Sequence, residues 1–335
     1  MPASVRRKLL VLLLVFGVVL ALAAAASAGN GGFAPETPHS PNASRINDSY
    51  KLIAVFTGAI FMIVEGSLIW FVIRYRNRGR PRTAEGPQIF AHTRLELMWT
   101  AVPVLIVAAI TAFVFYKLPG IKNVPAAKAQ GGPLVVKIEA HQFYWQFTYP
   151  NGATSIDELH APVNRVVRVE IHSEDVDHSW WVPELGGKFD AIPGRTTHTW
   201  FKADRVGTYR GQCGEFCGVF HAEMTARVMV EPEGAYRSFL SSVRAPLVLG
   251  GQEWRGVCAK CHGIAGKGGY GPAIQNNSVL VQHQGLLRLL QNGQNIRKPL
   301  ASYMPPVGRG WNDAQVKALE TYLKARVYKG TTSGG

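Results

Sequence analysis

Two long apolar segments constrain this 335-residue chain more than any other feature. Residues 52–73 and 97–116 are each long enough to cross a membrane, because about 20 apolar residues in a helix span the hydrocarbon core. The stretch between them is basic, with six arginines: Arg74, Arg76, Arg78, Arg80, Arg82 and Arg94. Short basic loops are retained in the cytoplasm. The sequence therefore predicts a membrane hairpin with both of its ends, and everything after Tyr116, on the outer side.

The N-terminus carries a shorter apolar run with the features of an export signal. Arg6-Arg7-Lys8 precedes apolar residues 9–22, and Ala26-Ser27-Ala28 follows. A basic stretch, an apolar core and an A-x-A cleavage site together make a secretory signal peptide. We expect residues 1–28 to be removed, which leaves residues 29–130 as an N-terminal segment that contains the hairpin. An uncleaved membrane anchor is the alternative.

Four potential metal ligands fall within twelve residues of the second half of the chain. Cys213 and Cys217 are followed by His221 and Met224. Thiolate, thioether and imidazole ligands favour copper over magnesium or calcium. A disulfide between the two cysteines is the alternative, but it would leave the histidine and the methionine at fixed offsets unexplained. The run therefore predicts a copper site.

The other two cysteines belong to Cys258-Ala259-Lys260-Cys261-His262. C-x-x-C-H is the attachment signature of a c-type haem, in which both thiols bond to the haem and the histidine binds its iron. A redox-active C-x-x-C and half a zinc site are the alternatives. A zinc site needs further ligands, and no other cysteine pair remains. We therefore expect a covalent haem c on Cys258 and Cys261, with His262 as the proximal iron ligand.

The net charge of +14 does not indicate a nucleic-acid partner. No basic stripe is interleaved with aromatic residues, and the N-terminal excess flanks the membrane segments. Residues 131–250 carry 11 Lys and Arg against 14 Asp and Glu, whereas residues 251–335 carry 11 against 3. Complementary charges favour docking of the two parts. We expect residues 233–250 to be a linker that tethers the C-terminal domain at high effective concentration.

The region between the membrane segments and the haem motif has the texture of β-structure. Residues 134–140, 165–171, 196–201 and 224–230 are rich in β-branched residues and partly alternate, and turn signals separate them. This pattern predicts an antiparallel β-sandwich over residues 131–232. The copper ligands would lie on the loop before its last strand.

A binuclear copper site needs a second histidine, and the pattern alone does not choose one. His178 follows an acidic run, residues 174–177, and comes at the end of a strand. The upstream candidates are His141, His160, His172, His178 and His198.

The chain resembles subunit II of the haem–copper cytochrome c oxidases, of the type with a cytochrome c domain fused at the C-terminus. The resemblance covers residues 45–232. It rests on the two-span hairpin, on residues 212–224 (the cysteine loop), and on residues 141–145 (HQFYW), 173–180 (SEDVDHSW) and 190–195 (DAIPGR). It implies a multi-domain membrane protein: a two-helix transmembrane hairpin, an all-β cupredoxin-like Greek-key sandwich, and a small all-α cytochrome c domain over residues 251–335.

The resemblance also implies a binuclear copper centre, called CuA. Cys213 and Cys217 would bridge both coppers. His178 and Met224 would complete one copper, and His221 and the backbone carbonyl of Glu215 the other. The side chain of Glu215 would point to a magnesium site at the boundary with subunit I. Sharing two thiolates spreads one electron over both metals, so that the bonds change little on reduction.

Three further positions have alternative interpretations. Glu96 resembles the glutamate at the cytoplasmic mouth of a proton pathway in the family, but an acid at a helix start also interacts well with the helix dipole. Glu65 lies within the first span, where an ionisable group indicates a function or a buried partner from a neighbouring subunit. Phe143 stands where the family often has the tryptophan through which electrons arrive, which puts that route in doubt.

The C-terminal segment suits a small helical cytochrome c, with residues 252–259 and 313–326 as its first and last helices. We predict Met304, in Tyr303-Met304-Pro305-Pro306, as the distal iron ligand, because it is the only methionine after the haem motif. A thioether opposite a histidine raises the haem potential. His283 is the alternative ligand.

These assignments predict the electron-accepting subunit of a terminal oxidase in a bacterial inner membrane, with its copper and haem domains on the periplasmic side. Electrons would pass from cytochrome c or another donor through haem c and CuA to subunit I, which reduces oxygen to water. Other oxidase subunits and the membrane are further partners. A CuA-bearing subunit of a nitric oxide reductase and a membrane-anchored copper chaperone are the alternatives, although a chaperone needs no haem.

Overall fold

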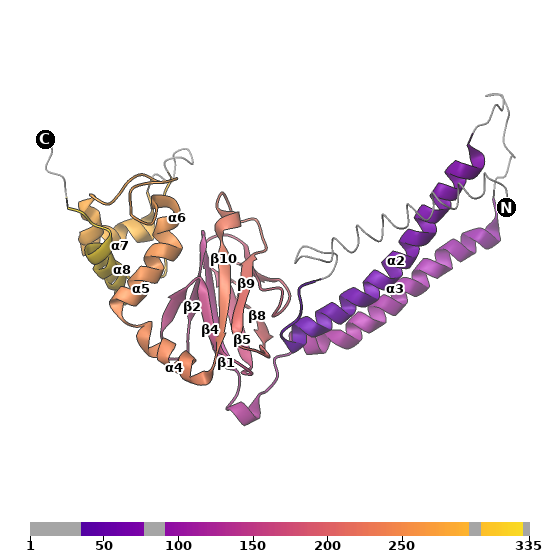
Figure 1. Cartoon of the computed structure of the whole chain (residues 1–335), viewed down its shortest axis with the longest axis horizontal. Coiled ribbons are helices and arrows are strands. Elements are labelled where there is room, and N and C mark those ends of the chain that lie inside the picture. Colours follow the sequence, from indigo (N-terminus) through magenta and orange to yellow (C-terminus); the bar gives the residue numbers. More distant parts are fainter. Residues whose placement is uncertain (1–34, 77–90, 295–302, 331–335) are drawn as a thin grey trace, which may run out of the picture.

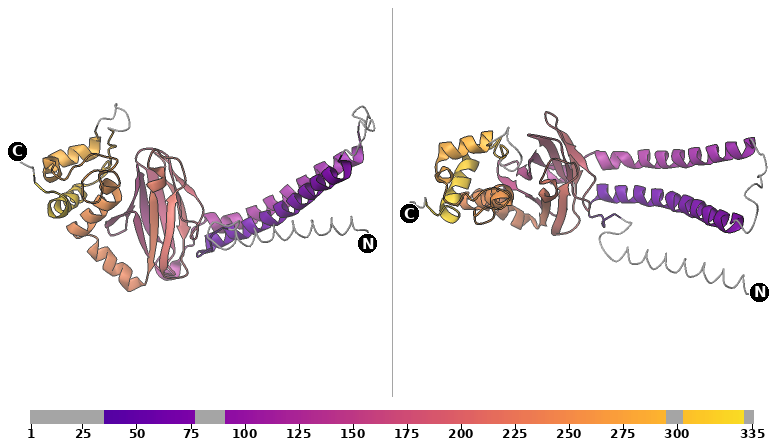
Figure 2. Two further views of the ribbon diagram at one scale, coloured as in Figure 1. Left: turned by 45° about the horizontal axis from the view of Figure 1, so that its top comes forward. Right: turned by 90° about the horizontal axis from the view of Figure 1, so that it is seen from above.

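The computed structural model describes residues 35–76, 91–294 and 303–330. These residues form a helical hairpin, a β-sandwich and a group of C-terminal helices, arranged one after another along the molecule (Figures 1 and 2). The hairpin and the C-terminal helices lie on opposite sides of the sandwich, and the predicted order of the three parts is confirmed. The expected signal peptide, residues 1–28, and three arginines of the basic loop (Arg78, Arg80 and Arg82) lie outside the described residues.

Two long helices form the hairpin and contain the predicted spans. They are α2 (Pro41–Tyr75) and α3 (Thr93–Lys122), and both are long and apolar enough to cross a membrane. Their apolar windows have no buried residues, as expected of surfaces that face lipid or other subunits. Near the sandwich, Lys117 Nζ lies 2.8 Å from Asp48 Oδ2 and joins the two helices.

The hairpin is attached to the sandwich by hydrogen bonds around one tryptophan. Trp200 donates from Nε1 to the carbonyl of Ile121, at the end of α3, over 2.9 Å. Its own carbonyl accepts from the buried Asn42, at the start of α2, over 2.5 Å. The sandwich therefore has a fixed position relative to the ends of both membrane helices.

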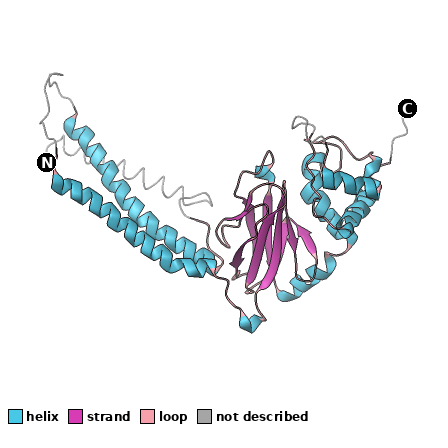
Figure 3. Cartoon of the chain, turned by 180° about the vertical axis from the view of Figure 1, so that it is seen from behind, coloured by secondary structure: helices cyan, strands magenta, loops and turns pink. Residues whose placement is uncertain are grey.

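Two five-stranded sheets pack face to face in the sandwich (Figure 3). Their orders are β3-β2-β1-β5-β8 and β4-β10-β9-β6-β7. The buried strands alternate inward and outward residues, as in β5, and the inward residues form one apolar core. The strands are β1 (Leu134–His141), β2 (Tyr144–Thr148), β3 (Thr154–Ile156), β4 (Glu158–Pro162), β5 (Val167–Ser173), β6 (His178–Trp181), β7 (Phe189–Ala191), β8 (Thr197–Phe201), β9 (Gly207–Cys213) and β10 (Thr225–Glu231).

The prediction of a wholly antiparallel sandwich was wrong in one respect. β1 pairs with β5, and β10 with β4, in parallel. Strands distant in the sequence thus meet side by side in each sheet, which local alternation of side chains does not reveal.

Residues 233–250, which we expected to be a linker, are largely helical and packed. Helix α4 (Glu233–Ser242) contributes Tyr236 to the core of the sandwich, and Phe239 stacks on His160 of β4 at a centroid distance of 3.6 Å. Helix α5 (Pro246–Glu253) then begins the C-terminal domain. The connection is therefore held against the sandwich.

The C-terminal domain is all-helical. The predicted first helix lies within a continuous helical run, and the predicted last helix has the expected bounds and a capping box between Asn312 and Gln315. Gly250 of α5 lies against the backbone of Ala318, a contact too close for any side chain. The remaining elements are the π-turn η3 (Trp254–Cys258), α6 (Ala259–His262), η4 (Ser278–Val281), α7 (His283–Asn292) and α8 (Asp313–Arg326).

Candidate metal and haem sites

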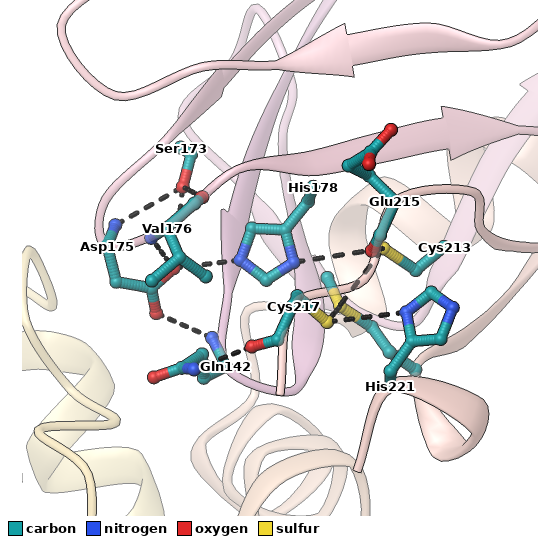
Figure 4. Close-up of polar contacts among 10 residues, drawn as sticks. Gln142, Ser173, Asp175, Val176, His178, Cys213, Glu215, Cys217 and His221 are labelled. Atoms are coloured by element: carbon teal, nitrogen blue, oxygen red, sulfur yellow. Dashed lines mark hydrogen bonds and ion pairs between the residues drawn. The ribbon is translucent and has the colours of Figure 1, made fainter. Parts of the chain in front are cut away.

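The predicted copper ligands converge at one end of the sandwich (Figure 4). Cys213 ends β9 and His178 begins β6, and the two strands are hydrogen-bonded neighbours in the same sheet. Cys217 follows on the loop between β9 and β10, and the short helix η2 (His221–Glu223) carries His221. The pairing of β6 with β9 thus brings together Cys213 and His178, which are 35 positions apart in the sequence, and the loop after β9 adds Cys217 and His221.

The two cysteines are poised for a metal. Their Sγ atoms are 4.0 Å apart and both thiols are free, whereas a disulfide needs about 2.0 Å. The ligand atoms of His178, Cys213 and Cys217 all lie within 4.8 Å of one another. All three residues are buried, so that water would not compete strongly for a bound metal.

The other three predicted ligands complete the group. His221 Nδ1 lies 3.6 Å from Cys217 Sγ, and Met224 Sδ lies 3.8 Å from the same sulfur. The carbonyl oxygen of Glu215 lies 3.2 Å from Cys213 Sγ. Two sulfurs in the centre, with two imidazoles, one thioether and one carbonyl around them, form a donor set that suits copper.

A carboxylate that our sequence analysis did not single out orients the upstream histidine. Asp175 Oδ1 lies 2.8 Å from His178 Nε2, while His178 Nδ1 faces Cys213 Sγ at 3.8 Å. Burial alone would lower the pKa of His178. The hydrogen bonds to Asp175 and Cys213 together have the larger effect, so the pKa of His178 lies above its ordinary value. The hydrogen bond from the Cys217 thiol lowers the pKa of Cys213, which favours one thiolate in the metal-free pair. A hydrogen bond between a carboxylate and the second ring nitrogen, like that of Asp175 with His178, sets the orientation of a metal-binding histidine.

The rival histidines have other partners. His160 lies 3.2 Å from Glu231, His172 lies 3.0 Å from Glu174, and His198 is exposed on β8. His141 is buried but stacks flat on Tyr144 at 4.6 Å. Among the five candidates, the described geometry brings only His178 to the cysteines.

The side chain of Glu215 does not by itself form a magnesium site. Its carboxylate lies 2.9 Å from Lys188 Nζ, which also lies 2.9 Å from Asp190. The ammonium group occupies the position between these carboxylates that a cation would take. A magnesium ion here would have to displace Lys188 and take its other ligands from subunit I, so the described residues of this chain do not fit the ion unaided.

The C-terminal domain encloses a cavity of about 800 Å³ around the C-x-x-C-H motif. Cys258, Cys261 and His262 line one wall, and Met304 also lines the cavity. The rest of the lining is mainly apolar, including Leu286, Leu290, Leu319 and Leu323. Ligand pockets for cofactors reach this size, and an apolar wall suits a porphyrin.

The ring of the motif's histidine is held by a backbone carbonyl. His262 Nδ1 donates to the carbonyl of Pro272 over 2.8 Å, which leaves Nε2 to act as the ligand. Burial raises the pKa of the Cys258 thiol to about 12. A redox-active C-x-x-C needs a readily formed thiolate instead. The motif therefore fits haem attachment better than disulfide exchange.

Met304 is held in place through its backbone. It forms an isolated antiparallel bridge with Gln294, with hydrogen bonds of 2.9 and 3.0 Å. Gly293, at φ +66°, packs against the Met304 carbonyl where a side chain would clash. The rival, His283, is not among the residues that line the cavity and instead contacts Asp313 at 2.9 Å and Glu320 at 3.1 Å.

The haem cavity is partly walled by the copper domain. Gln142, Phe143 and Phe220 of the sandwich line it together with the haem motif. Tyr144 and Ile156 are buried in the apolar core of the C-terminal domain, and Tyr144 donates to the carbonyl of Val307 over 2.5 Å. The two domains therefore share a core.

An ion pair closes the same interface. Lys260 Nζ, within the haem motif, lies 2.7 Å from Asp157 Oδ2 and 2.8 Å from the carbonyl of Phe143. The exposed fractions of the two side chains are only 19% and 17%. Asp157 also accepts a hydrogen bond from the backbone amide of Trp145 over 2.9 Å, so its carboxylate links β2 to the C-terminal domain.

We expect Asp157→Asn to weaken the docking of the C-terminal domain. Asparagine keeps the shape and the bond to Trp145 but leaves the half-buried ammonium of Lys260 unpaired, a change that costs about 3 kcal/mol in buried pairs. Urea unfolding of the full chain, followed by tryptophan fluorescence, should show an earlier transition. Asp177→Asn, on an exposed loop residue, is the control. Identical unfolding of both variants would contradict the structural role of the pair.

The membrane residues singled out from the sequence have simple surroundings. Glu96 lies in the first turn of α3, and its Oε1 accepts from the amide of His92 over 3.1 Å, as a helix cap does. Glu65 lies exposed on α2. The role of Glu96 in proton movement remains a prediction, as does a functional role of Glu65.

Comparison with known proteins agrees with this architecture. Three family models match: the transmembrane domain of cytochrome c oxidase subunit II over residues 30–117, its periplasmic domain over residues 153–231, and subunit III of cbb3-type cytochrome c oxidase over residues 246–323. The last corresponds to a cytochrome c domain.

Individual relatives carry the same description. Cytochrome c oxidase subunit 2 of Alkalihalophilus pseudofirmus is 32% identical over 309 residues, which cover 86% of this chain and 89% of the relative. Cytochrome c oxidase subunit 2 of Cereibacter sphaeroides is 31% identical over 64% of this chain and 81% of its own length. The crystal structure of the periplasmic domain of subunit II of cytochrome oxidase from Bradyrhizobium japonicum is 33% identical, with a TM-score of 0.34 over 36% of this chain and 97% of that chain.

The sequence match over most of both lengths confirms the resemblance inferred from the motifs. Since its relatives are subunits of oxidoreductase complexes, the protein is a subunit of such a membrane enzyme. The chain belongs to the cytochrome c oxidase subunit II family and carries a cytochrome c domain after its membrane hairpin and cupredoxin sandwich.

Proposed function

We propose that this chain accepts electrons on a covalently attached haem c and passes them through a binuclear CuA centre to subunit I, which reduces oxygen to water. The observation that carries the proposal is the common wall of the two sites. Gln142 lines the haem cavity and also donates a hydrogen bond to the backbone carbonyl of Cys217 in the cysteine loop. A donor site and an acceptor site within one folded unit suit rapid electron transfer.

Each residue would have a distinct task. Cys213 and Cys217 would bridge the copper pair, with His178 and Met224 on one ion and His221 and the Glu215 carbonyl on the other. Cys258 and Cys261 would hold the porphyrin, and His262 and Met304 would bind its iron from opposite sides. Copper and iron supply the reversible one-electron chemistry when bound. The sandwich and the four buried ligands, His178, Cys213, Cys217 and Met224, would limit movement of the site between oxidation states.

The expected location follows from the hairpin. The loop between the two spans is basic and would therefore stay in the cytoplasm. The copper and haem domains would then face the periplasm of a bacterial inner membrane. Cytochrome c or another donor would deliver electrons there, and subunit I would receive them within the membrane. Attachment of c-type haem on the outer side agrees with this arrangement.

Copper and haem analysis of the purified full-length chain tests this assignment. We expect two copper ions and one covalent haem per chain, with the spectrum of a mixed-valence copper pair. A copper chaperone would hold a single, readily removed ion and no haem. Isolation of the chain with a nitric oxide reductase instead of an oxygen-reducing subunit would overturn the choice of enzyme.

Replacing Met304 tests the haem ligation separately. We expect Met304→Ala to lose the weak absorption band near the red end of the ferric spectrum, which reports sulfur bound to iron, and to lower the haem potential because thioether ligation raises it. Optical redox titration measures both effects, with His283→Ala as the control. Retention of the band in Met304→Ala would rule out Met304 as the ligand.

A further inference from the structure

We propose that Gln142 is the positioning residue that couples the haem pocket to the copper centre. This inference rests on the proposed function and adds a specific route to it. Gln142 lies between the first two strands of the sandwich and touches both sites, one through its place in the cavity wall and the other through hydrogen bonds.

On the haem side, Gln142 is part of the wall of the cavity. It lines the cavity of about 800 Å³ that also holds Cys258, Cys261 and His262. The neighbouring Phe143 lines the same cavity, and its carbonyl accepts a hydrogen bond from Lys260, one of the two residues between the predicted haem cysteines. Gln142 and Phe143 would therefore be neighbours of a porphyrin held in this cavity.

On the copper side, two hydrogen-bonded paths leave Gln142 (Figure 4). Its side-chain Nε2 donates to the carbonyl of Cys217 over 2.7 Å. Its backbone amide donates to Asp175 Oδ2 over 2.6 Å, and Asp175 Oδ1 lies 2.8 Å from His178 Nε2. Gln142 is thus linked by hydrogen bonds to the carbonyl of Cys217 and, through Asp175, to His178.

A glycine in the cysteine loop leaves space for the Gln142 side chain. Gly218 follows Cys217 at φ +131°, a conformation that suits glycine. A Cβ atom at this position would lie 3.1 Å from Gln142 Nε2 and 3.1 Å from the Phe143 ring. The absence of a side chain at Gly218 therefore permits the close approach of the amide to the loop.

An aromatic route runs alongside and offers a comparison. Tyr270 of the haem domain contacts Phe220 at a centroid distance of 4.7 Å, and Phe220 contacts Phe143 at 5.6 Å. Phe220 precedes His221. Phe220 itself lines the cavity, so this route reaches His221 alone, through the main chain, whereas Gln142 reaches both Cys217, which would be shared by the two coppers, and His178. We therefore assign the main path to Gln142.

The step itself is a simple transfer of one electron. One electron would leave the haem iron, which would change from ferrous to ferric, and would reduce the copper pair. No bond to Gln142 forms or breaks, and the transfer needs no proton from it. The side chain contributes coupling and a fixed separation of the two sites.

The test compares Gln142→Met with wild type in the full chain loaded with copper and haem. Methionine has a similar length but cannot donate to the Cys217 carbonyl. We expect transfer from haem to copper after flash reduction to slow by about tenfold, within the range caused by small displacements of reacting groups. The potentials of both centres and the copper hyperfine splitting in electron paramagnetic resonance should remain those of wild type.

Gln252→Met is the matched control. Gln252 of α5 is also half-buried at the domain interface, where its Oε1 accepts from the amide of Ile156 over 3.4 Å, but it does not line the cavity. We expect its transfer rate to stay close to that of wild type. Hydrogen exchange of the segment around residues 256–262 should show that both variants keep the domains docked.

The outcomes are distinct. Slow transfer in Gln142→Met alone, with potentials unchanged, supports the assignment. A wild-type rate in Gln142→Met, or equal losses in both variants, overturns it while leaving the proposed function intact. A wild-type protein in which haem and copper exchange no electrons within the chain would instead overturn the proposed function.

Discussion

Replacing Cys217 by serine is expected to empty the copper site and to stop electron transfer to subunit I. Cys217 lies at the centre of the ligand group, 4.0 Å from Cys213 Sγ, 3.6 Å from His221 Nδ1 and 3.8 Å from Met224 Sδ. A hydroxyl group does not replace a thiolate as a ligand for a soft metal. Copper analysis and the visible spectrum of the purified full chain would report the loss.

The fold should survive this substitution. Serine nearly matches cysteine in size, and burying its hydroxyl costs about 1–3 kcal/mol if it lacks a partner. The haem spectrum and haem content should be unchanged, because the haem cysteines lie in a separate pocket. A Cys217→Ser protein with a full copper pair and a normal spectrum would contradict the ligand assignment.

Replacing Cys258 and Cys261 together by alanine is expected to abolish covalent haem attachment. Both thiols line the cavity beside His262. Without the two thioether links, any haem would be held only by the iron ligands and apolar contacts. Haem staining after denaturing electrophoresis should be negative, whereas copper content should match that of wild type.

The emptied domain should also be less stable. A ligand that binds only the folded state stabilises it by mass action, and a covalent ligand cannot dissociate. Its loss exposes a cavity of about 800 Å³ lined by leucines and aromatic residues. Retention of haem under denaturing conditions in the double variant would contradict attachment at these cysteines.

The C-terminal domain is docked on the sandwich, which changes how its proposed donor role is understood. The charge difference between residues 131–250 and 251–335 suggested a domain that docks while a linker tethers it at high effective concentration. The structure has instead a helical connection, a shared apolar core around Tyr144 and a half-buried pair of Lys260 with Asp157. Part of the charge complementarity thus stabilises a fixed arrangement. The aromatic wall at Phe143 and Phe220 is used by the attached haem domain.

The order of the three parts and the core of both sites could be predicted from sequence because they rest on local signals. Apolar runs of about 20 residues identify spans, and Cys213, Cys217, His221 and Met224 fall within one loop. Cys258, Cys261 and His262 are adjacent in the same way. His178 required the family resemblance, because its approach to the cysteines depends on the pairing of β6 with β9.

The rest depends on contacts between distant residues. Asp157 and Lys260 are 103 positions apart, and Gln142 and Cys217 are 75 apart. No periodicity or spacing reports such pairs. The amphipathic pattern of α4, with Tyr236 and Phe239 on the sandwich, was a local signal that could have corrected the linker prediction. Parallel pairing of β1 with β5 likewise leaves no mark in either strand alone.

The central claim is that electrons move from the haem to the copper pair inside one chain. The most direct measurement is time-resolved absorbance of both centres after flash reduction of the haem, repeated over a wide range of protein concentration. The account predicts that haem oxidation and copper reduction occur together, with a first-order rate that does not depend on concentration. A rate that rises in proportion to protein concentration, or a reduced haem that leaves the copper pair oxidised, would contradict it.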